Sequence, residues 1–381
     1  MKRIISFVLV IALLALPMAG AEESIETSAS VPGVSAGAWA VYDATAGRFL
    51  ASGAGDEGRR MASTTKIMTA LVAIENFSLE TEVEFTRDMI AEGSSMYLKI
   101  GEKAALRDLL YGLMLMSGND AAKAIASLGE GGEPGFVRLM NEKAEELGLK
   151  NTSFANPNGL DADGHHTTAK ELALIAAAAM ENETFREIVS TYSGIFAGRA
   201  MTNHNKLLRR IDGCIGVKTG YTIASGRCLV SAVERDGRMV IVVTLNAPSD
   251  WSDHERLHEW AFERYSSREI VCSEQVYGYI PVEGGLSAKV AVRAEETLTL
   301  SLTDEEYSHL ETAVYLPRFV YAPIQAGASA GEIVVTLDGS ELARAELVYD
   351  GDAERAAPRE LNFGEKVKDW FETLAWKLGL C

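Results

Sequence analysis

The sequence has few cysteines, fewer basic than acidic residues and few long apolar runs. Each of these three shortages argues against a class of protein. Its 381 residues contain 4 cysteines, and their spacing is not that of a small scaffold held by disulfides. The 54 acidic residues against 36 basic ones give a net charge of −18, which argues against nucleic acid as a partner. Beyond the first segment, no stretch is apolar enough to span a bilayer. The length favours two domains with additional terminal segments.

Residues 1–21 have the pattern of a secretory signal peptide. Lys2 and Arg3 precede an apolar run from Ile4 to Leu16, and small residues at the end of the segment offer a cleavage site. Pro17 closes the run before about 18 apolar residues accumulate, so a spanning helix is the weaker alternative. Cleavage removes two positive charges and changes the net charge from −18 to −20. We therefore expect an exported protein.

The cysteines are predicted to be free thiols. They are Cys214, Cys228, Cys272 and Cys381. A hairpin that turns between residues 222 and 226 would place Cys228 opposite about Gly220, so Cys214 and Cys228 would not face each other.

The order of patterns over residues 33–267 predicts an α+β domain in which helices flank an antiparallel sheet. A strand-like hairpin is expected first, over residues 38–50. Apolar residues at three- and four-residue steps then predict an α-helical subdomain, with helices from about residue 63 and over 106–116, 120–128 and 169–180. Strands are expected again over 213–221, 228–234 and 239–246, and a helix over 251–265 would cover this sheet.

A small β-rich domain is predicted over residues 270–349, followed by an amphipathic tail over 359–381. The expected strands cover residues 276–282, 288–292, 297–302, 333–337 and 342–349. The apolar face of the tail consists of Phe363, Val367, Trp370, Phe371, Leu374 and Leu378. We favour a helix that lies in the plane of a membrane surface, and a helix packed on the β domain is the alternative.

Three short motifs in a fixed order indicate an acyl-transfer site, and the first is Ser63-Thr64-Thr65-Lys66. Residues three apart on a helix share a face, so the amine of Lys66 can reach the hydroxyl of Ser63. A lysine is a base only when neutral, and burial and a nearby cation such as Lys218 lower its pKa. Taken alone, the string fits a capping serine and a solvated lysine equally well.

The other two motifs, Ser117-Gly118-Asn119 and Lys218-Thr219-Gly220, complete the predicted chemistry. Ser117 can pass a proton between Lys66 and a leaving amine, and Asn119 can donate to a substrate amide carbonyl. A strand that carries a cation, a hydroxyl and a glycine can pair with an extended peptide and hold its carboxylate. The backbone N–H groups of Ser63 and Tyr221 are the expected oxyanion hole.

One further string, His254-Glu255-Arg256-Leu257-His258, has the spacing of a zinc-protease site. It falls on the helix expected to cover the sheet, and the sequence offers no persuasive third ligand. We therefore predict no metal. The other histidines of interest, His165, His166 and His204, are interpreted as hydrogen-bonded loop residues.

With these motifs the chain resembles the low-molecular-mass penicillin-binding proteins, specifically the exported serine-type D-alanyl-D-alanine carboxypeptidases. The resemblance covers about residues 33–349. It includes the further strings Gly93–Leu98, Arg107–Met114, Asn156–Leu160 and Asn205–Leu208. Gly118 stands where β-lactamases often have aspartate, and there is no E-x-x-L-N string of the class A β-lactamase kind.

The resemblance implies a β-lactamase/transpeptidase-like fold and removal of the terminal D-alanine from peptidoglycan stem peptides that end in D-Ala-D-Ala. It implies a serine acyl-enzyme, acylation by β-lactam antibiotics and no metal or organic cofactor. The implied catalytic residues are Ser63, Lys66 and Ser117, and the implied substrate-binding residues are Asn119, Lys218, Thr219, Gly220 and Tyr221.

The resemblance also implies where the protein acts, and three alternative functions remain open. The implied place of action is extracytoplasmic, with the chain peripheral on the outer face of the cell membrane. A β-lactamase, a non-catalytic wall-binding or penicillin-sensing protein, and the zinc peptidase of the histidine string are the alternatives.

Overall fold

The computed structural model describes residues 31–357 and 362–377. The expected signal peptide, residues 1–21, lies outside these ranges, as do Leu378 and Cys381. Residues 31–265 form helices and strands in the order β1 (Ala38–Asp43), β2 (Arg48–Gly53), η1 (Ala62–Thr65), α1 (Lys66–Asn76), β3 (Glu82–Glu84), η2 (Arg87–Met89), β4 (Lys103–Ala105), α2 (Leu106–Leu115), α3 (Asn119–Ala126), α4 (Glu133–Glu146), α5 (Ala169–Glu181), α6 (Glu183–Ser190), β5 (Ser193–Phe196), β6 (Arg199–Thr202), η3 (Lys206–Arg209), β7 (Cys214–Thr222), β8 (Gly226–Arg235), β9 (Arg238–Leu245) and α7 (Asp250–Arg264).

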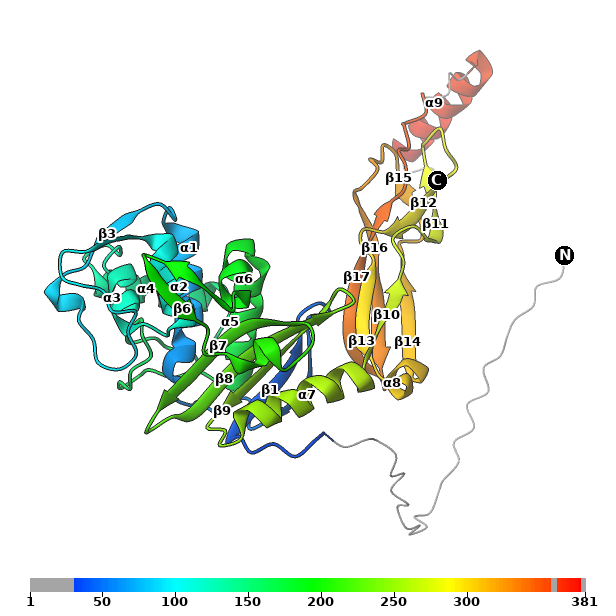
Figure 1. The fold of residues 1–381 in the computed structure, drawn as a ribbon. Helices are drawn as coiled ribbons and strands as arrows, with labels where there is room; N and C mark the ends of the chain where they lie inside the picture. The colour runs from blue at the N-terminus through cyan, green and yellow to red at the C-terminus, as the bar shows by residue number, and fades with distance from the viewer. Residues whose placement is uncertain (1–30, 358–361, 378–381) are drawn as a thin grey trace, which may run out of the picture. The chain divides into compact units, whose positions relative to one another are not determined.

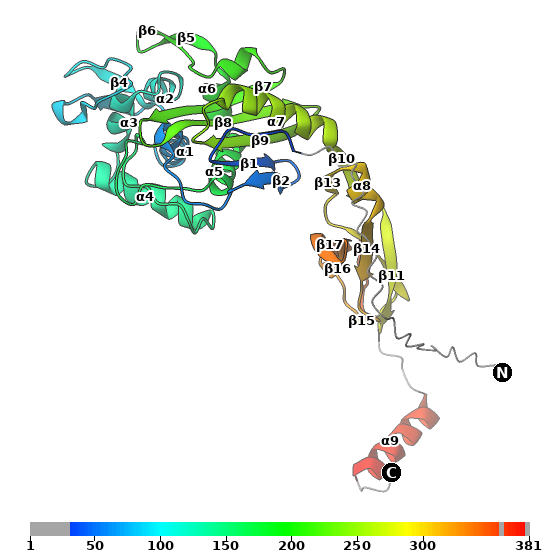
Figure 2. The same ribbon diagram turned by 90° about the horizontal axis from the view of Figure 1, so that it is seen from below.

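A five-stranded antiparallel sheet in the order β2-β1-β9-β8-β7 organises this part of the chain (Figure 1). The first strand pairs with a late one, since Ala38 lies opposite Leu245, so the α-helical segments form an insertion between the two halves of the sheet. Helix α7 packs on β8 and β9, and α5 packs on β1 and β9 (Figure 2). This arrangement confirms the predicted α+β fold class.

Helix α1 lies at the centre of the helical insertion. Its first eight residues, from Lys66 to Ala73, are buried on every side of the helix. A helix that is apolar around its whole circumference is stable only inside a core. The lysine at its start is therefore forced into the same dry surroundings as its apolar neighbours.

The structure also contains helices that the sequence patterns did not predict. The main ones are α4 and α6. Helix α4 begins with Glu133-Pro134-Gly135, and these residues resemble a turn even though proline is well suited to the first positions of a helix. Strand β7 and strand β8 form the predicted hairpin, with Gly220 opposite Cys228. The three described cysteines, Cys214, Cys228 and Cys272, are free thiols, as predicted.

Residues 266–349 form a second set of strands with a hydrophobic core of its own. This core includes Val292, Val335 and Leu347, which are completely buried. Six strands pair in the order β14-β16-β17-β12-β11-β15, and β10 pairs with β13. The elements of this part and of the tail are β10 (Ser266–Val271), β11 (Val276–Glu283), β12 (Lys289–Ala294), β13 (Leu298–Leu302), α8 (Asp304–Ser308), β14 (Leu310–Tyr315), β15 (Val320–Tyr321), β16 (Ser329–Leu337), β17 (Ser340–Tyr349) and α9 (Phe363–Lys377).

The tail helix α9 exposes large apolar side chains. Phe363, Trp370 and Phe371 are 84%, 59% and 58% exposed. Among the described residues, no helix has both the length and the apolar character needed to cross a membrane.

A buried ion pair at the end of β1 leads to a stability prediction. The side chain of Asp43 is completely buried, and it accepts hydrogen bonds from Arg238 Nε at 2.6 Å, Ser301 Oγ at 2.5 Å and the backbone N–H of Ala46 at 2.8 Å. Asp43→Ala would leave Arg238 buried without its carboxylate. We expect the free energy of unfolding in urea to fall by about 3–5 kcal/mol.

Asp56→Ala is the matched control, because Asp56 is exposed and pairs with Lys170 at the surface. We expect this variant to lose less than about 1 kcal/mol. A loss for Asp43→Ala as small as that of the control would contradict the role given to the buried pair.

Candidate active site

Ser63 and Lys66 meet where η1 passes into α1. Lys66 Nζ lies 2.8 Å from Ser63 Oγ, 2.7 Å from Asn119 Oδ1 and 2.5 Å from the carbonyl oxygen of Asn158. Lys66 is completely buried, and burial, reinforced by the positive charge of Lys218, lowers the pKa of Lys66 well below its ordinary value. A neutral amine in this place can donate to the two amide oxygens and accept the hydroxyl proton of Ser63.

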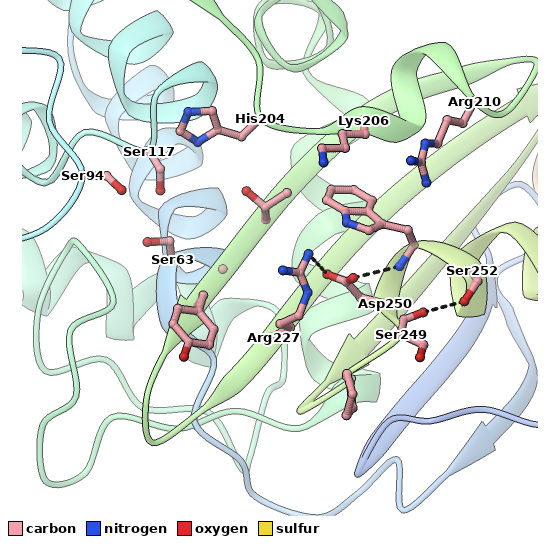
Figure 3. A pocket seen from close by; sticks show the side chains of 15 residues that line it. Ser63, Ser94, Ser117, His204, Lys206, Arg210, Arg227, Ser249, Asp250 and Ser252 are labelled. Carbon is pink, nitrogen blue, oxygen red and sulfur yellow. Dashed lines mark hydrogen bonds and ion pairs between the residues drawn. The ribbon is translucent and has the colours of Figure 1, made fainter.

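Ser117 lies in the turn between α2 and α3, and Asn119 is the first residue of α3. Ser117 is a non-glycine residue with a φ of 57°, in the left-handed region, where strain is often found at functional sites. Its hydroxyl faces the same groove as Ser63 and Ser94 (Figure 3). Within the described part of the chain, no hydrogen bond joins Ser117 to Lys66. The amide of Asn119 accepts from Lys66 and donates to the carbonyl oxygen of Glu92 at 2.6 Å.

Asp120, next in the chain, holds the loop that brings Ser94 to the site. Its carboxylate accepts from Met96 N at 3.0 Å, Leu98 N at 3.2 Å and Ser95 Oγ at 2.6 Å. The sequence patterns did not predict a role for Asp120, Ser94 or Asn158. Ser94 and Asn158 lie in the strings Gly93–Leu98 and Asn156–Leu160, which support the family resemblance. These strings were the signal in the sequence that could have identified the two residues.

The edge strand β7 forms the opposite wall of the site. A Cβ atom on Gly220 would lie 3.0 Å from the backbone nitrogen of Ser63, so glycine allows the strand to approach the serine closely. Lys218 is 1% exposed, and its Nζ donates to the carbonyl oxygen of Thr219 at 3.0 Å. Burial lowers the pKa of Lys218 to about 7. Tyr221, the next residue after Gly220, is 64% exposed at the rim.

A groove of about 780 Å³ runs past these residues (Figure 3). Five of the eight predicted site residues line it, and they are Ser63, Ser117, Thr219, Gly220 and Tyr221. The other three, Lys66, Asn119 and Lys218, are buried beside it. The lining also includes residues that the sequence analysis did not assign to the site, among them His204, Lys206, Arg227 and Trp251.

The histidines of the H-E-x-x-H string bind α7 to the sheet. Ser231 Oγ lies 2.6 Å from His254 Nδ1 and 2.6 Å from His258 Nε2, and His254 Nε2 lies 2.9 Å from Thr244 Oγ1. Burial lowers the pKa of His258 to about 3, so its ring is neutral. Glu255 pairs with Arg210 instead of approaching the histidines. Over residues 31–357 and 362–377, no group of three or more His, Cys, Asp or Glu side chains is arranged to hold a metal ion.

The other histidines have different surroundings. His165 accepts from the backbone N–H of Ala155 at 3.0 Å and contacts Thr65 Oγ1 at 2.8 Å, as expected of a hydrogen-bonded loop residue. His204 instead lines the groove, where burial and the charge of Lys218 lower its pKa.

Comparison with known proteins relates this geometry to a family. Residues 25–249 match the family model described as D-alanyl-D-alanine carboxypeptidase, and residues 265–355 match that of the penicillin-binding protein 5 C-terminal domain. The D-alanyl-D-alanine carboxypeptidase DacD of Salmonella typhimurium is 33% identical over 82% of this chain and 85% of its own length. DacF of Bacillus subtilis is 29% identical over 81% of this chain and 84% of its own.

A solved structure agrees with these matches. Penicillin-binding protein 5 from Haemophilus influenzae superposes with a TM-score of 0.76 at 25% identity, covering 86% of this chain and 100% of the other.

The buried Lys218 predicts a specific pH dependence of stability. Its pKa of about 7 in the folded protein lies below the ordinary value of 10.5 for a lysine, so above pH 7 the unfolded chain binds more protons than the folded one. The free energy of unfolding should therefore rise with pH above pH 7, by at most about 1.4 kcal/mol per unit from this group. In Lys218→Met the rise should be smaller when urea unfolding is measured at pH 7, 8 and 9, and the rise that remains comes from Lys66, whose pKa is also lowered.

Lys150→Met, at an exposed lysine, should keep the pH dependence of the wild type. Equal slopes for wild type and Lys218→Met would show that Lys218 titrates normally.

Proposed function

The chain belongs to the family of D-alanyl-D-alanine carboxypeptidases, and we propose that Ser63 is the nucleophile with which it removes the terminal D-alanine from peptidoglycan stem peptides. The family models and the named relatives support a serine peptidase that also binds penicillin. The observation that carries the assignment of Ser63 is its 2.8 Å contact with Lys66, a completely buried lysine whose pKa is strongly lowered.

Acylation begins when neutral Lys66 takes the proton of Ser63, whose oxygen attacks the carbonyl carbon of the penultimate D-alanine. The backbone N–H groups of Ser63 and Tyr221 stabilise the oxyanion. The close approach of Gly220 to the nitrogen of Ser63 supports this pairing, since it brings the two N–H groups to one side of the site. The C–N bond then breaks, and D-alanine leaves with the proton that Lys66 delivers through Ser117.

Deacylation uses the same groups with water in place of the leaving amine. Lys66 takes a proton from the water, which attacks the ester carbon, and Ser63 recovers its proton. The shortened stem peptide leaves with a new carboxylate. No redox step or additional reactant is required.

The substrate lies along the edge of β7 in this proposal. Strand β7 is at the end of the sheet order, so its outer edge can pair with an extended peptide. The hydroxyl of Thr219 binds the terminal carboxylate of the substrate. The buried amine of Lys218 contributes its positive charge from inside the protein. Asn119 donates its second amide N–H to the substrate, because its first already serves Glu92.

The three alternatives are not favoured. A β-lactamase would share the acylation and hydrolyse the drug rapidly, and a penicillin sensor would not turn over peptide. The matches to the carboxypeptidase family over residues 25–249 support neither. The zinc peptidase would require ligands from His254 and His258, but both nitrogens of His254 and Nε2 of His258 contact the hydroxyl groups of Ser231 and Thr244.

We also propose that the protein acts outside the cytoplasm and lies on the outer face of the cell membrane. The signal-peptide pattern of residues 1–21 supports export. The exposed aromatic side chains of Phe363, Trp370 and Phe371 on α9 support membrane contact, because aromatic rings are favoured at the boundary between headgroups and acyl chains.

The assignment of Ser63 and Lys66 predicts the effect of two substitutions. Ser63→Ala should abolish release of D-alanine from a peptide ending in Lys-D-Ala-D-Ala and covalent labelling by penicillin. Lys66→Arg should lower the acylation rate by about 10²–10⁴-fold, because a guanidinium stays protonated. Lys150→Arg, at an exposed position, is the control. Release that survives in Ser63→Ala, or rapid penicillin hydrolysis by the wild type, would contradict the proposal.

The tail proposal predicts the effect of a deletion. Removal of residues 363–381 should abolish binding to liposomes in a flotation assay and leave peptide hydrolysis intact. Trp370→Asp should weaken binding, and Lys368→Gln, on the polar face, should not. Binding that persists without the tail would refute its role as the membrane contact.

A further inference from the structure

His165 is a buried histidine that the proposed reaction does not use. Its side chain is 4% exposed, and it lies in the loop that also carries Asn158, whose carbonyl oxygen accepts from Lys66 at 2.5 Å. Both nitrogens of its ring have a partner, the backbone of Ala155 on one side and the hydroxyl of Thr65 on the other. These two contacts fix the position of the ring beside the start of α1.

The protonation of the ring follows from its partners. The backbone N–H of Ala155 can only donate, so Nδ1 of His165 accepts it at 3.0 Å and the proton of a neutral ring must be on Nε2. Burial lowers the pKa of His165 to about 4, so the ring is neutral near pH 7. Nε2 lies 2.8 Å from Thr65 Oγ1 and therefore donates to that hydroxyl.

Thr65 extends this hydrogen bonding to the backbone that precedes the serine. Its oxygen accepts from His165, and its own proton is donated to the carbonyl oxygen of Ala62 at 2.8 Å. The result is a chain of three hydrogen bonds that all run in one direction, from the N–H of Ala155 through the imidazole and the hydroxyl to the carbonyl of Ala62. Hydrogen bonds connected in this way polarise and strengthen one another.

The carbonyl of Ala62 belongs to the same peptide group as the N–H of Ser63. A trans peptide group is planar, and its C=O and N–H point in opposite directions. A donor that fixes the direction of this carbonyl therefore also fixes the direction of the N–H. Because the N–H of Ser63 is one of the two donors of the proposed oxyanion hole, the orientation of this peptide group decides how well the oxyanion is stabilised.

This peptide group needs support from outside η1. Ala62 has a φ of 47°, in the left-handed region that is unfavourable for a residue with a Cβ atom. The carbonyl oxygen of Ala62 is also enclosed, because a Cβ atom on Gly159 would lie 2.0 Å from it. Water therefore has little room to replace a donor at this oxygen, and the contact with Thr65 becomes more important.

We propose that His165 is a positioning residue that orients the Ala62–Ser63 peptide group through Thr65, and so aligns the oxyanion hole of the acyl transfer. This inference rests on the proposed function, since it concerns the same reaction. His165 acts through Thr65 and is not itself a catalytic residue. Its contribution should appear when negative charge develops on the carbonyl oxygen of the substrate, and not when the substrate binds.

Asparagine and glutamine each reproduce one nitrogen of the imidazole, and this separates the two contacts of His165. In His165→Gln the amide NH₂ stands at the ε position, where it can donate to Thr65, and Ala155 loses its acceptor. In His165→Asn the amide oxygen stands at the δ position, where it can accept from Ala155, and Thr65 loses its donor. A role confined to the structure of the loop would make asparagine the better substitute, whereas the positioning role favours glutamine.

The measurement is the steady-state release of D-alanine from a peptide ending in Lys-D-Ala-D-Ala. In His165→Asn we expect kcat to fall by about 10–100-fold and KM to stay within about twofold of the wild-type value. The loss should be smaller than the roughly 10²–10³-fold that follows removal of a whole oxyanion donor, because here the donor is only misaligned. His165→Gln should keep kcat within about threefold of wild type.

A peptide boronic acid provides an independent readout. Its tetrahedral adduct with Ser63 places a hydroxyl group where the oxyanion of the reaction forms. The inhibition constant should rise in His165→Asn by about the factor by which kcat/KM falls, and it should stay near the wild-type value in His165→Gln.

Thr65→Val tests the same chain of hydrogen bonds from its other member. The substitution removes the hydroxyl at nearly constant volume and should lower kcat by about the same factor as His165→Asn. Adding His165→Asn to Thr65→Val should lower kcat no further, because both changes interrupt one chain. Losses that multiply in the double variant would contradict action through Thr65.

His166→Gln is the matched control, because His166 is the exposed neighbour of His165 and its Nδ1 lies 3.2 Å from the carbonyl oxygen of Gly164. It should keep the wild-type kcat. Urea unfolding of every variant checks that a lower kcat does not follow from a lower stability. Equal kcat values in His165→Asn and His165→Gln, or a loss that appears mainly in KM, would overturn the inference.

Release of D-alanine by the wild type distinguishes this inference from the proposed function. Absence of release would refute the proposed function. Normal release by the wild type, together with equal rates in the asparagine and glutamine variants, would refute the positioning role of His165 alone.

Discussion

The structure depends on the burial of one lysine amine without a carboxylate partner. Taking an ammonium group out of water costs several kcal/mol, and an adjacent carboxylate would reduce that cost while keeping the lysine charged. The described part of the chain instead surrounds Lys66 Nζ with the neutral oxygens of Ser63, Asn119 and Asn158, and adds the nearby charge of Lys218. The neutral amine is therefore favoured, and a neutral lysine beside a serine can act as a base.

Such a pocket must be assembled from segments far apart in the chain, and glycines allow them to meet. A Cβ atom on Gly220 would press on the backbone of Ser63, and one on Gly159 would lie 2.0 Å from the carbonyl oxygen of Ala62. Gly159 also has a φ of 84°, which few other residues adopt. The backbone of η1 is thus enclosed by β7 on one side and by the loop that carries Asn158 on the other.

The two ends of the groove are built by different means. At the end that carries Ser63, Lys66 is held rigidly because it begins a helix whose first eight residues are buried. At the distal end, the exposed cations Lys206 and Arg227 lie against Trp251, and Arg227 pairs with Asp250.

Much of the fold and part of the site were determined by the sequence alone. Periodicity located the strands of the main sheet and the helices α1, α2, α3, α5 and α7, because their apolar faces repeat regularly. Helix α4 was missed because its first residues look like a turn. The spacing of Ser63 and Lys66 was enough to predict their contact, since residues three apart on a helix are neighbours.

Contacts between distant segments were decided only by the tertiary structure. The sequence could not show that Asn158 accepts from Lys66, that Asp120 holds the loop of Ser94, or that Arg227 lies beside Trp251. It also could not show that His254 and His258 share Ser231. A local pattern specifies which residues lie on one face of one element, whereas the pairing of β1 with β9 and the packing of loops around α1 depend on the whole chain.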